Sequence, residues 1–219
     1  GYEIEGATIE SINLSDYYKN AHNYACPGKG AVEDAREICE QLGIKHHVVN
    51  FSDSFKENVI DYFVNDYLDG NTPNPCVKCN PIIKWGELIK TADSLNADFI
   101  ATGHYANIEK QDLNGSARFV LSKGYDQRKD QSYFLWRLSQ DQLSRTLFPL
   151  GGIDKTKTRE LAEKYNLSVK NKPESQEICF IADDDYRNFL RMAIPDIDDK
   201  IGRGKILKDG KVIGEHEGY

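Results

Sequence analysis

Residues 72–80 read TPNPCVKCN, and they separate two stretches of helical periodicity. Pro73 and Pro75 have fixed φ angles and disfavour the helical conformation in the residues that precede them, so an extended, stiff loop is predicted here. Asn-Pro at 80–81 is typical of a helix N-cap followed by the first helical residue. The pattern therefore places Cys79 at a helix N-terminus, where the macrodipole and the free backbone amides favour a reactive thiolate.

Strand-like and helix-like segments alternate on both sides of this loop. Strands are predicted at 1–9, 46–51 and 98–102, and helices at 31–42, 54–68 and 81–95. This order is typical of an α/β fold with a doubly wound parallel sheet, in which ligands bind beyond the carboxyl ends of the strands. Gly103 and His104 follow one such end. The glycine would let a ligand approach the backbone, and the histidine either donates to a phosphate or ribose or is merely satisfied at the strand end.

The second half of the chain differs in pattern. A hairpin is predicted at 105–121, followed by a capping box at Ser139 and Gln142, by helices at 155–165 and 184–193, and by a hairpin at 204–215. Because no parallel strand is evident after about residue 138, the sequence predicts domains at 1–138, 139–198 and 199–219. The last of these would be the start of a β-domain, since a lone hairpin is only marginally stable.

Composition limits the class of protein. The chain has 219 residues, 39% of them hydrophobic and 29% charged, values that are ordinary for a soluble globular protein. It contains no apolar run near the ~20 residues of a membrane span. Five cysteines form an odd set that indicates a reducing compartment, so a cytoplasmic protein without a membrane partner is expected.

Charge is unevenly distributed along the chain. The net charge is −7, but residues 118–172 carry twelve Lys and Arg against six Asp and Glu. This window therefore has a net charge of +6 within an otherwise acidic chain. The asymmetry permits a basic face that binds nucleic acid, although a solvated lysine-rich surface would show the same charge pattern.

Two further cysteines can be interpreted from their neighbours. Cys39 lies on the apolar face of the predicted helix at 31–42, so it is expected to be a small core residue. Cys179 is flanked by Ile178 and Phe180, which favours a buried thiol, whereas the polar run before it indicates an exposed loop.

Several motifs together resemble the tRNA-specific 2-thiouridylase family. They are the loop at 72–80, ATGHY at 101–105, KDQSYFLW at 129–136, LFPLGG at 147–152 and SQEICFI at 175–181. The resemblance implies an ATP-pyrophosphatase domain of the PP-loop type, a helical tRNA-binding bridging domain and a C-terminal β-barrel. The first strand and the phosphate-binding loop of that family would precede Gly1, and the hairpin at 204–215 would begin the barrel.

The resemblance also implies a reaction, its cofactors and its partners. It predicts ATP-dependent 2-thiolation of the wobble uridine, position 34 of tRNA, by adenylation of uracil O2 and sulfur transfer from a cysteine persulfide. ATP and Mg²⁺ would be the cofactors. The partners would be the anticodon stem-loop of tRNA and a sulfur-carrier or cysteine desulfurase protein, and the protein itself is expected to be a monomer.

The resemblance implies functional roles only for residues at positions that match the motifs of the family. Cys79 matches the nucleophile, and Cys179 matches the cysteine that carries the persulfide. The remaining positions would contact the substrates: Asn74, Pro75 and Cys76 at the target base, His104, Lys129, Asp130 and Gln131 on the tRNA, and Gly103 and Ile9 at ATP.

The chain departs from the family at three positions. Many relatives have Asp where this chain has Cys76, most have Lys where it has Pro81, and Gly is usual where it has Glu177. The first departure raises the possibility that Cys76, Cys79 and Cys179 hold an iron–sulfur cluster with one open iron.

Two further functions are compatible with the sequence. One is an ATP-pyrophosphatase that adenylates a small molecule, which would need no thiols, and the second is an RNA-binding or iron–sulfur scaffold without enzymatic activity.

Overall fold

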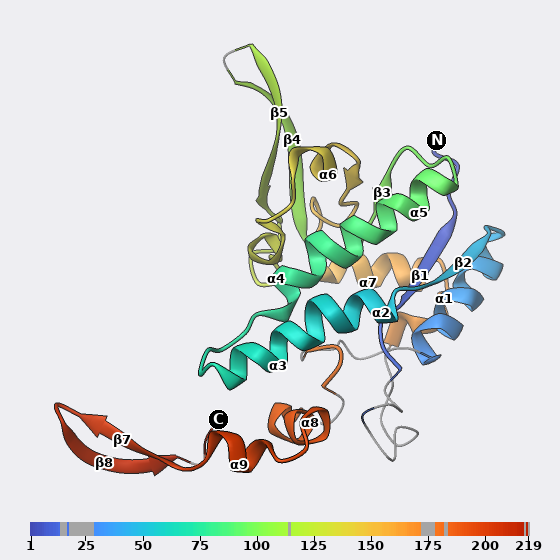
Figure 1. The fold of residues 1–219 in the computed structure, drawn as a ribbon. Coiled ribbons are helices and arrows are strands. Elements are labelled where there is room, and N and C mark those ends of the chain that lie inside the picture. The colour runs from blue at the N-terminus through green and yellow to red at the C-terminus, as the bar shows by residue number, and fades with distance from the viewer. Residues whose placement is uncertain are drawn as a thin grey trace. The chain divides into compact units, whose positions relative to one another are not determined.

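The computed structural model of the chain describes residues 1–13, 17, 29–113, 115–171, 178–181, 184–216 and 218. The chain forms two compact units. Figure 1 labels the helices and strands along the chain. Unit 1 comprises residues 1–6, 34–46 and 76–174, and unit 2 comprises residues 7–33, 47–75 and 175–219.

A pair of strands and a helix begin the chain. β1 (Gly6–Glu10) and β2 (His46–Asn50) are hydrogen-bonded neighbours. The amide of Gly6 donates to Lys45 O at one end, and the amide of Phe51 donates to Glu10 O at the other, so the two strands run in the same direction. The helix predicted at 31–42 is confirmed as α1 (Lys29–Leu42).

The Cys39 thiol is buried, as predicted. Its sulfur would overlap a Cβ atom added at Gly6, so the glycine permits the close approach of α1 to β1.

In unit 2, one continuous helical run, 52–68, is built from α2 (Ser52–Phe55), η3 (Lys56–Ile60) and α3 (Asp61–Leu68). It confirms the helix predicted at 54–68. Phe55 and Phe63 on its apolar face are 1% and 0% exposed. Both rings contact Phe180 edge to face, with centroids 5.8 and 5.1 Å apart, so aromatic rings pack together within the core of this unit.

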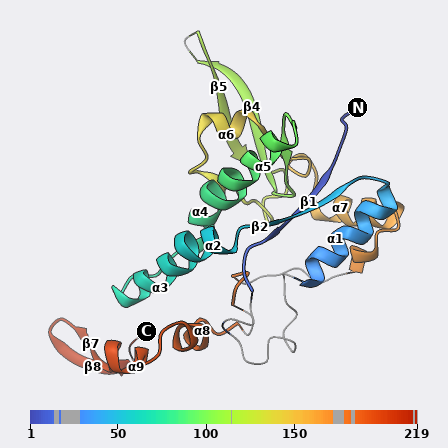
Figure 2. The ribbon, with the colours of Figure 1, turned by 45° about the vertical axis from the view of Figure 1, so that its right-hand side comes forward.

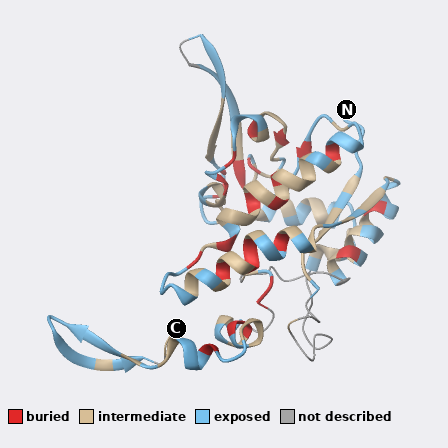
Figure 3. Cartoon of the chain, in the orientation of Figure 1, coloured by how far each residue is buried: buried red, intermediate tan, exposed pale blue. Residues whose placement is uncertain are grey.

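The same unit contains the C-terminal elements. They are α8 (Tyr186–Ala193), α9 (Ile197–Ile201), and the hairpin of β7 (Gly204–Lys208) and β8 (Lys211–His216). α8 and the hairpin were predicted, whereas α9 was missed. The hairpin has no buried residue along either strand (Figure 3).

A second helical run, 75–94, passes through the central motif and consists of α4 (Pro75–Cys79), η4 (Asn80–Glu87) and α5 (Leu88–Ser94). The prediction of an extended loop up to residue 80 is therefore wrong at its C-terminal end. Pro75 starts the helix because proline at a first helical position has no amide to leave unpaired. Pro81 lies inside the run, where the wider π-helical turn of η4 accommodates the missing amide.

Unit 1 contains a parallel pair of short strands. β3 (Ile100–Ala101) pairs with β6 (Thr146–Leu147), with Ile100 opposite Thr146. The prediction that no parallel strand follows residue 138 is therefore wrong. β6 was missed because two residues carry no alternation that can be recognised. Parallel pairing confirms the α/β class, and the predicted domain boundaries at 138 and 198 stay predictions.

A long hairpin, a capped helix and two further helical segments complete unit 1. β4 (Ala106–Leu113) pairs with β5 (Ser116–Lys123), and the hairpin that they form extends away from the helices of that unit (Figure 2). Asn114, the first residue of the predicted turn, lies outside the described residues. α6 (Gln140–Ser144) begins at the predicted capping box of Ser139 and Gln142. The other segments are η5 (Ser132–Leu135), α7 (Lys155–Lys164) and η6 (Ser168–Asn171).

The core of unit 1 lies between the helical run 75–94 and the base of the β4–β5 hairpin (Figure 3). Its buried members are Trp85, Ala92, Ile100, Ala106, Leu135, Leu138 and Leu143. Within the described part of the chain, no helix is long and apolar enough to cross a membrane.

Candidate functional site

Cys76 and Cys79 both lie in α4, three residues apart, so their side chains share one side of the helix. Cys79 is the last residue of α4 and has helical φ and ψ angles of −59° and −45°. It therefore does not cap a helix N-terminus, as the sequence had indicated, but lies in the second turn of a longer helical run. The macrodipole acts mainly within the first turn, so it contributes less to Cys79 than was expected.

Lys84 is a cation of this helical run that sequence analysis missed. Cys76 is exposed as a residue, yet the protein atoms around its sulfur raise the pKa of the thiol by burial, and the positive charge of Lys84 partly opposes this rise. Cys76 is therefore a protonated thiol at neutral pH. Spacing in the sequence did not pair the two residues, because Lys84 follows Cys76 by eight residues, about two turns of the helical run.

His104 lies three residues beyond the end of β3, among aromatic rings. Its ring centroid is 5.5 Å from that of Trp85 and 6.0 Å from that of Phe148, and its Nδ1 is 2.8 Å from Thr102 Oγ1. Burial, helped by the charge of Lys84, lowers the pKa of His104 to about 3. The imidazole is therefore neutral at physiological pH and acts as a hydrogen-bonding group rather than as a cation.

The low pKa of His104 makes stability depend on pH. The pKa is about 3 in the folded state and 6.5 for the unperturbed group, so the unfolded chain takes up the proton first as the pH falls. We expect the free energy of unfolding to decrease between about pH 6.5 and pH 3 through this residue. NMR titration should show a neutral His104 ring at pH 5, and His104→Gln should reduce the pH dependence of unfolding. A His104 ring that titrates near its ordinary pKa would contradict this assignment.

The two residues expected at ATP lie just after a strand and within one. Gly103 is exposed, and an added Cβ would meet only Leu150, at 3.6 Å, so the backbone after β3 is open to a ligand. Ile9 is half-buried in β1. Gly103 belongs to unit 1 and Ile9 to unit 2.

The side chains of Asp130 and Gln131 are used inside the protein. Asp130 accepts hydrogen bonds from the amide of Gly124 at 2.9 Å and from the hydroxyl of Ser132 at 2.8 Å. Gln131 accepts one from the amide of Tyr105 at 3.0 Å, while its own backbone amide donates to Tyr105 O at 2.9 Å. These contacts hold the 124–132 segment onto the segment that contains His104. Lys129 is half-buried beside them.

Asn80 is a second residue that sequence analysis misinterpreted. It is 2% exposed and lies in η4 rather than at a helix start. Its side-chain amide donates to Phe134 O at 2.8 Å, so it ties η5 to the helical run that carries both cysteines. Among the described residues, its Oδ1 atom has no hydrogen-bond partner. Only the fold could show this role, because Phe134 follows by more than fifty residues.

Cys179 is exposed in unit 2. Its neighbour Phe180 is 1% exposed and packs against Phe55, Phe63 and Phe189. The buried-thiol interpretation is therefore wrong, and the exposed-loop interpretation is confirmed. The aromatic side chain holds this segment in the core and leaves the sulfur outside. Glu177 lies outside the described residues.

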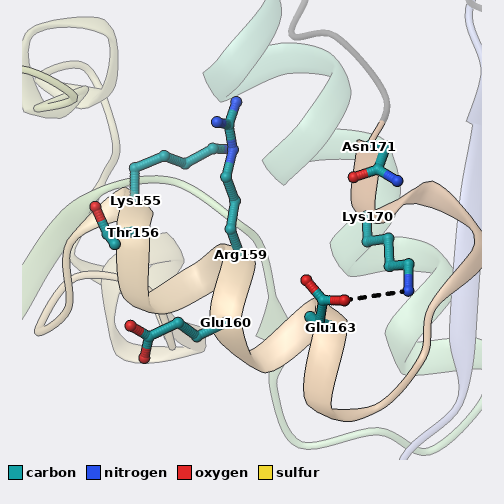
Figure 4. A pocket seen from close by; sticks show the side chains of 7 residues that line it. All are labelled: Lys155, Thr156, Arg159, Glu160, Glu163, Lys170 and Asn171. Carbon is teal, nitrogen blue, oxygen red and sulfur yellow. Dashed lines mark ion pairs between the residues drawn. The ribbon is translucent and has the colours of Figure 1, made fainter.

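A polar pocket of about 470 Å³ lies along α7 and η6 in unit 1 (Figure 4). Its lining residues are Lys155, Thr156, Arg159, Glu160, Glu163, Lys170 and Asn171. Lys155 and Arg159 reach toward the same side of it, and Lys170 pairs with Glu163 at 3.5 Å. The pocket lies in the predicted basic window and contains none of the predicted site residues. In the part of the chain that the structure describes, no group of three or more His, Cys, Asp or Glu is placed to hold a metal ion.

Comparison with known proteins identifies the family. The model of the tRNA methyl transferase HUP domain matches residues 1–183. The chain belongs to this family. Over its whole length the chain is 44% identical to a protein of Cytophaga hutchinsonii, 43% to one of Clostridium beijerinckii and 46% to one of Heliobacterium modesticaldum. All three are named tRNA-specific 2-thiouridylase MnmA, which confirms the resemblance inferred from the motifs.

The chain spans 59% of the first two of these relatives and 55% of the third. Membership of the HUP family agrees with the parallel strand pairs and with the PP-loop type of fold. The predicted site residues are divided between the two units. Unit 1 contains Cys76, Cys79, Gly103, His104 and the 129–131 segment, and unit 2 contains Ile9, Asn74, Pro75 and Cys179.

Proposed function

We propose that the full-length protein is a tRNA-uridine 2-sulfurtransferase that replaces O2 of the wobble uridine, position 34, by sulfur in an ATP-dependent reaction. The observation that carries this proposal is the match of the whole chain to proteins named tRNA-specific 2-thiouridylase. The exposed thiol of Cys179 and the half-buried thiol of Cys79 support it, because sulfur transfer needs accessible sulfur atoms.

The reaction is proposed to begin with ATP. Uracil C2 is a poor electrophile, and its oxygen is a poor leaving group until adenylation of O2 releases pyrophosphate and makes AMP the leaving group. Gly103 and Ile9 are proposed to contact ATP, and the open backbone at Gly103 fits that role. Mg²⁺ would be held mainly by phosphate oxygens and water, as is usual for this ion.

Sulfur transfer is proposed to follow in two steps. The terminal sulfur of a persulfide on Cys179 attacks C2 and displaces AMP, which leaves the RNA joined to Cys179 through a disulfide. The thiolate of Cys79 then attacks the Cys179 sulfur, so the 2-thiouridine leaves and a Cys79–Cys179 disulfide forms. A thiol reductant reopens that disulfide, and a sulfur-carrier or cysteine desulfurase protein reloads Cys179.

The target base is proposed to be flipped out beside Asn74, Pro75 and Cys76. Lys129 and the loop held by Asp130 and Gln131 would contact the RNA, as would the neutral His104. The Lys155 and Arg159 side chains at the α7 pocket would add attraction to phosphates.

We further propose that the parallel strand pairs belong to one doubly wound PP-loop sheet, that 139–198 is a helical bridging domain, and that 199–219 starts a β-barrel.

The test is thiolation of an anticodon stem-loop RNA by the full-length protein with ATP and a persulfide donor. We expect one 2-thiouridine at the wobble position, detected by mass spectrometry of the nucleosides, and none when ATP is omitted. A stem-loop with cytidine at that position is the matched control and should remain unmodified. A protein that consumes ATP but never transfers sulfur would point to an adenylating enzyme of another specificity.

A cluster-dependent version of the same activity is the second candidate. Cys76 and Cys79 share one side of α4, as two ligands of one iron–sulfur cluster would. Among the described residues no set of three ligands is assembled, so Cys179 would have to join the two cysteines when a cluster binds. Iron and acid-labile sulfide should be measured on anaerobically purified protein. Full thiolation without either element would exclude the cluster.

A further inference from the structure

Tyr133 and Trp136, hereafter the aromatic pair, are large rings that the fold leaves in solvent. They are 65% and 64% exposed. Tyr133 lies in the 3₁₀ turn η5, and Trp136 continues that turn with helical φ and ψ angles. Residues three apart eclipse in 3₁₀ geometry, so both rings lie on the same face. Single exposed aromatic residues are common on protein surfaces, so the distinguishing feature of this pair is that two rings share one face of a turn.

The opposite face of the same turn is fixed in the core. Leu135 and Leu138, also three residues apart, are 1% and 8% exposed and belong to the core of unit 1. Phe134 O accepts the side-chain amide of Asn80 at 2.8 Å. The turn therefore cannot rotate to bury the aromatic pair without breaking the core, and the two rings are held ready for a partner.

Arginine accompanies the aromatic pair. The Arg137 guanidinium lies 5.7 Å from the centre of the Trp136 ring. Arg128, in the same segment, has a side chain that is 90% exposed and pairs with Asp126 at 3.8 Å. The acidic residues of this segment are turned inward. Asp126 is 7% exposed and accepts the amides of Arg128 and Lys155, and Asp130 binds Gly124 and Ser132.

We propose that Tyr133 and Trp136 form a stacking platform for unpaired bases of single-stranded RNA, with Arg137 contacting a flanking phosphate. This proposal rests on the proposed function, in which an RNA loop is the substrate. Aromatic rings beside arginines suit unpaired nucleotides, because every base has a face that can stack and every linkage carries a negative charge. A fully paired duplex hides those faces and would not use the platform.

The test measures binding of two RNAs by the full-length protein. One is an anticodon stem-loop, and the other is a fully paired duplex of the same length. Stacking on one aromatic side chain contributes about 1–3 kcal/mol per base, so Trp136→Ala and Tyr133→Ala should each weaken stem-loop binding about 5- to 150-fold. Duplex binding should change little. Trp136→Phe, which keeps a flat ring, should retain most of the affinity.

Tyr165→Ala is the matched control. Tyr165 is 55% exposed and has the Lys164 ammonium 5.6 Å from its ring, but it lies at the end of α7. Its removal should leave RNA affinity unchanged.

Tryptophan fluorescence provides a second measurement. Trp85 is 1% exposed and hydrogen-bonded to Thr146, so RNA should not reach it. The emission of Trp136, obtained as the difference between the protein and its Trp136→Phe variant, should be quenched by the stem-loop.

Normal stem-loop affinity in Trp136→Ala and Tyr133→Ala would overturn the stacking platform while the proposed function stands. Equal losses for duplex and stem-loop would also overturn it, because they would indicate a purely electrostatic contact. A protein that binds neither RNA and transfers no sulfur would overturn both proposals, and burial of the aromatic pair by a protein partner would then be the remaining explanation.

Discussion

Cys79→Ala is expected to lower the rate of tRNA thiolation by about 10³-fold or more, the scale of loss seen when a covalent nucleophile is removed. Its sulfur is the group proposed to release the thiolated base from Cys179. The half-buried side chain lies on a rigid helical run, so the substitution should leave the fold intact. The measurement is 2-thiouridine formed per RNA in a single turnover, without small thiols present.

The variant should also reveal the intermediate. Without Cys79, the RNA should remain joined to Cys179 through a disulfide, visible as a covalent protein–RNA adduct that dithiothreitol releases as thiolated RNA. Cys179→Ala should form no adduct at all. Thiolation at the normal rate in either variant would remove that cysteine from its proposed role.

Cys76→Ala separates the two proposed mechanisms, since Cys76 lies in the same helix, three residues away. Persulfide transfer predicts a much smaller loss than in Cys79→Ala, because the Cys76 thiol, whose pKa is raised by burial, is not a nucleophile in that scheme. A cluster bound by three thiolates predicts losses of the same size in both variants. Cys39→Ala, at the buried thiol beside Gly6, serves as a cysteine control away from the site.

Gly151→Ala is expected to have the largest effect on stability, a loss of about 3 kcal/mol or more in the free energy of unfolding, at or above the usual range for overpacking. A Cβ atom at this buried position would overlap the carbonyl oxygen of Ala106 and the side-chain oxygen of Asn107. A backbone oxygen cannot move aside as a flexible side chain can. Gly151 O also accepts hydrogen bonds from the amide of Tyr125 at 2.8 Å and from the Asn107 side chain at 3.2 Å.

Gly152→Ala provides a control with identical chemistry one residue later. An added Cβ there would meet nothing within 4 Å, and the backbone conformation is not left-handed. Its unfolding midpoint in urea should equal that of the unmodified protein or exceed it slightly. Equal stability of the two alanine variants would show that the base of the β4–β5 hairpin moves freely away from Gly151.

Part of the fold could be predicted because its signals are local. The capping box of Ser139 and Gln142 and the four-residue apolar spacing from Phe55 to Tyr67 depend on neighbours within one or two turns. The hairpin at 204–215 was likewise predicted from its Asp-Gly turn. In each case the residues that interact are close in sequence, so their spacing carries the information.

Other features depended on residues far away in the chain. β6 is a strand only because β3 lies beside it, and the two residues of β6 have no strand pattern of their own. The proline-rich segment was predicted to be a loop up to residue 80, but helix formation from Pro75 is supported by the packing of Ile83 and Trp85 into the core. The burial of these side chains stabilises the helix more than the local preference of the proline-rich segment for an extended conformation opposes it, as is common in packed domains.

The sequence by itself determined the family, the α/β class and the identity of the two cysteines proposed to transfer sulfur, because motif order and residue type are written in the chain. Only the tertiary structure decided that Cys179 is exposed beside a buried Phe180, that His104 is neutral, and that Tyr133 and Trp136 face solvent. Exposure and pKa depend on how many atoms from distant segments surround a group, and no local pattern records that number.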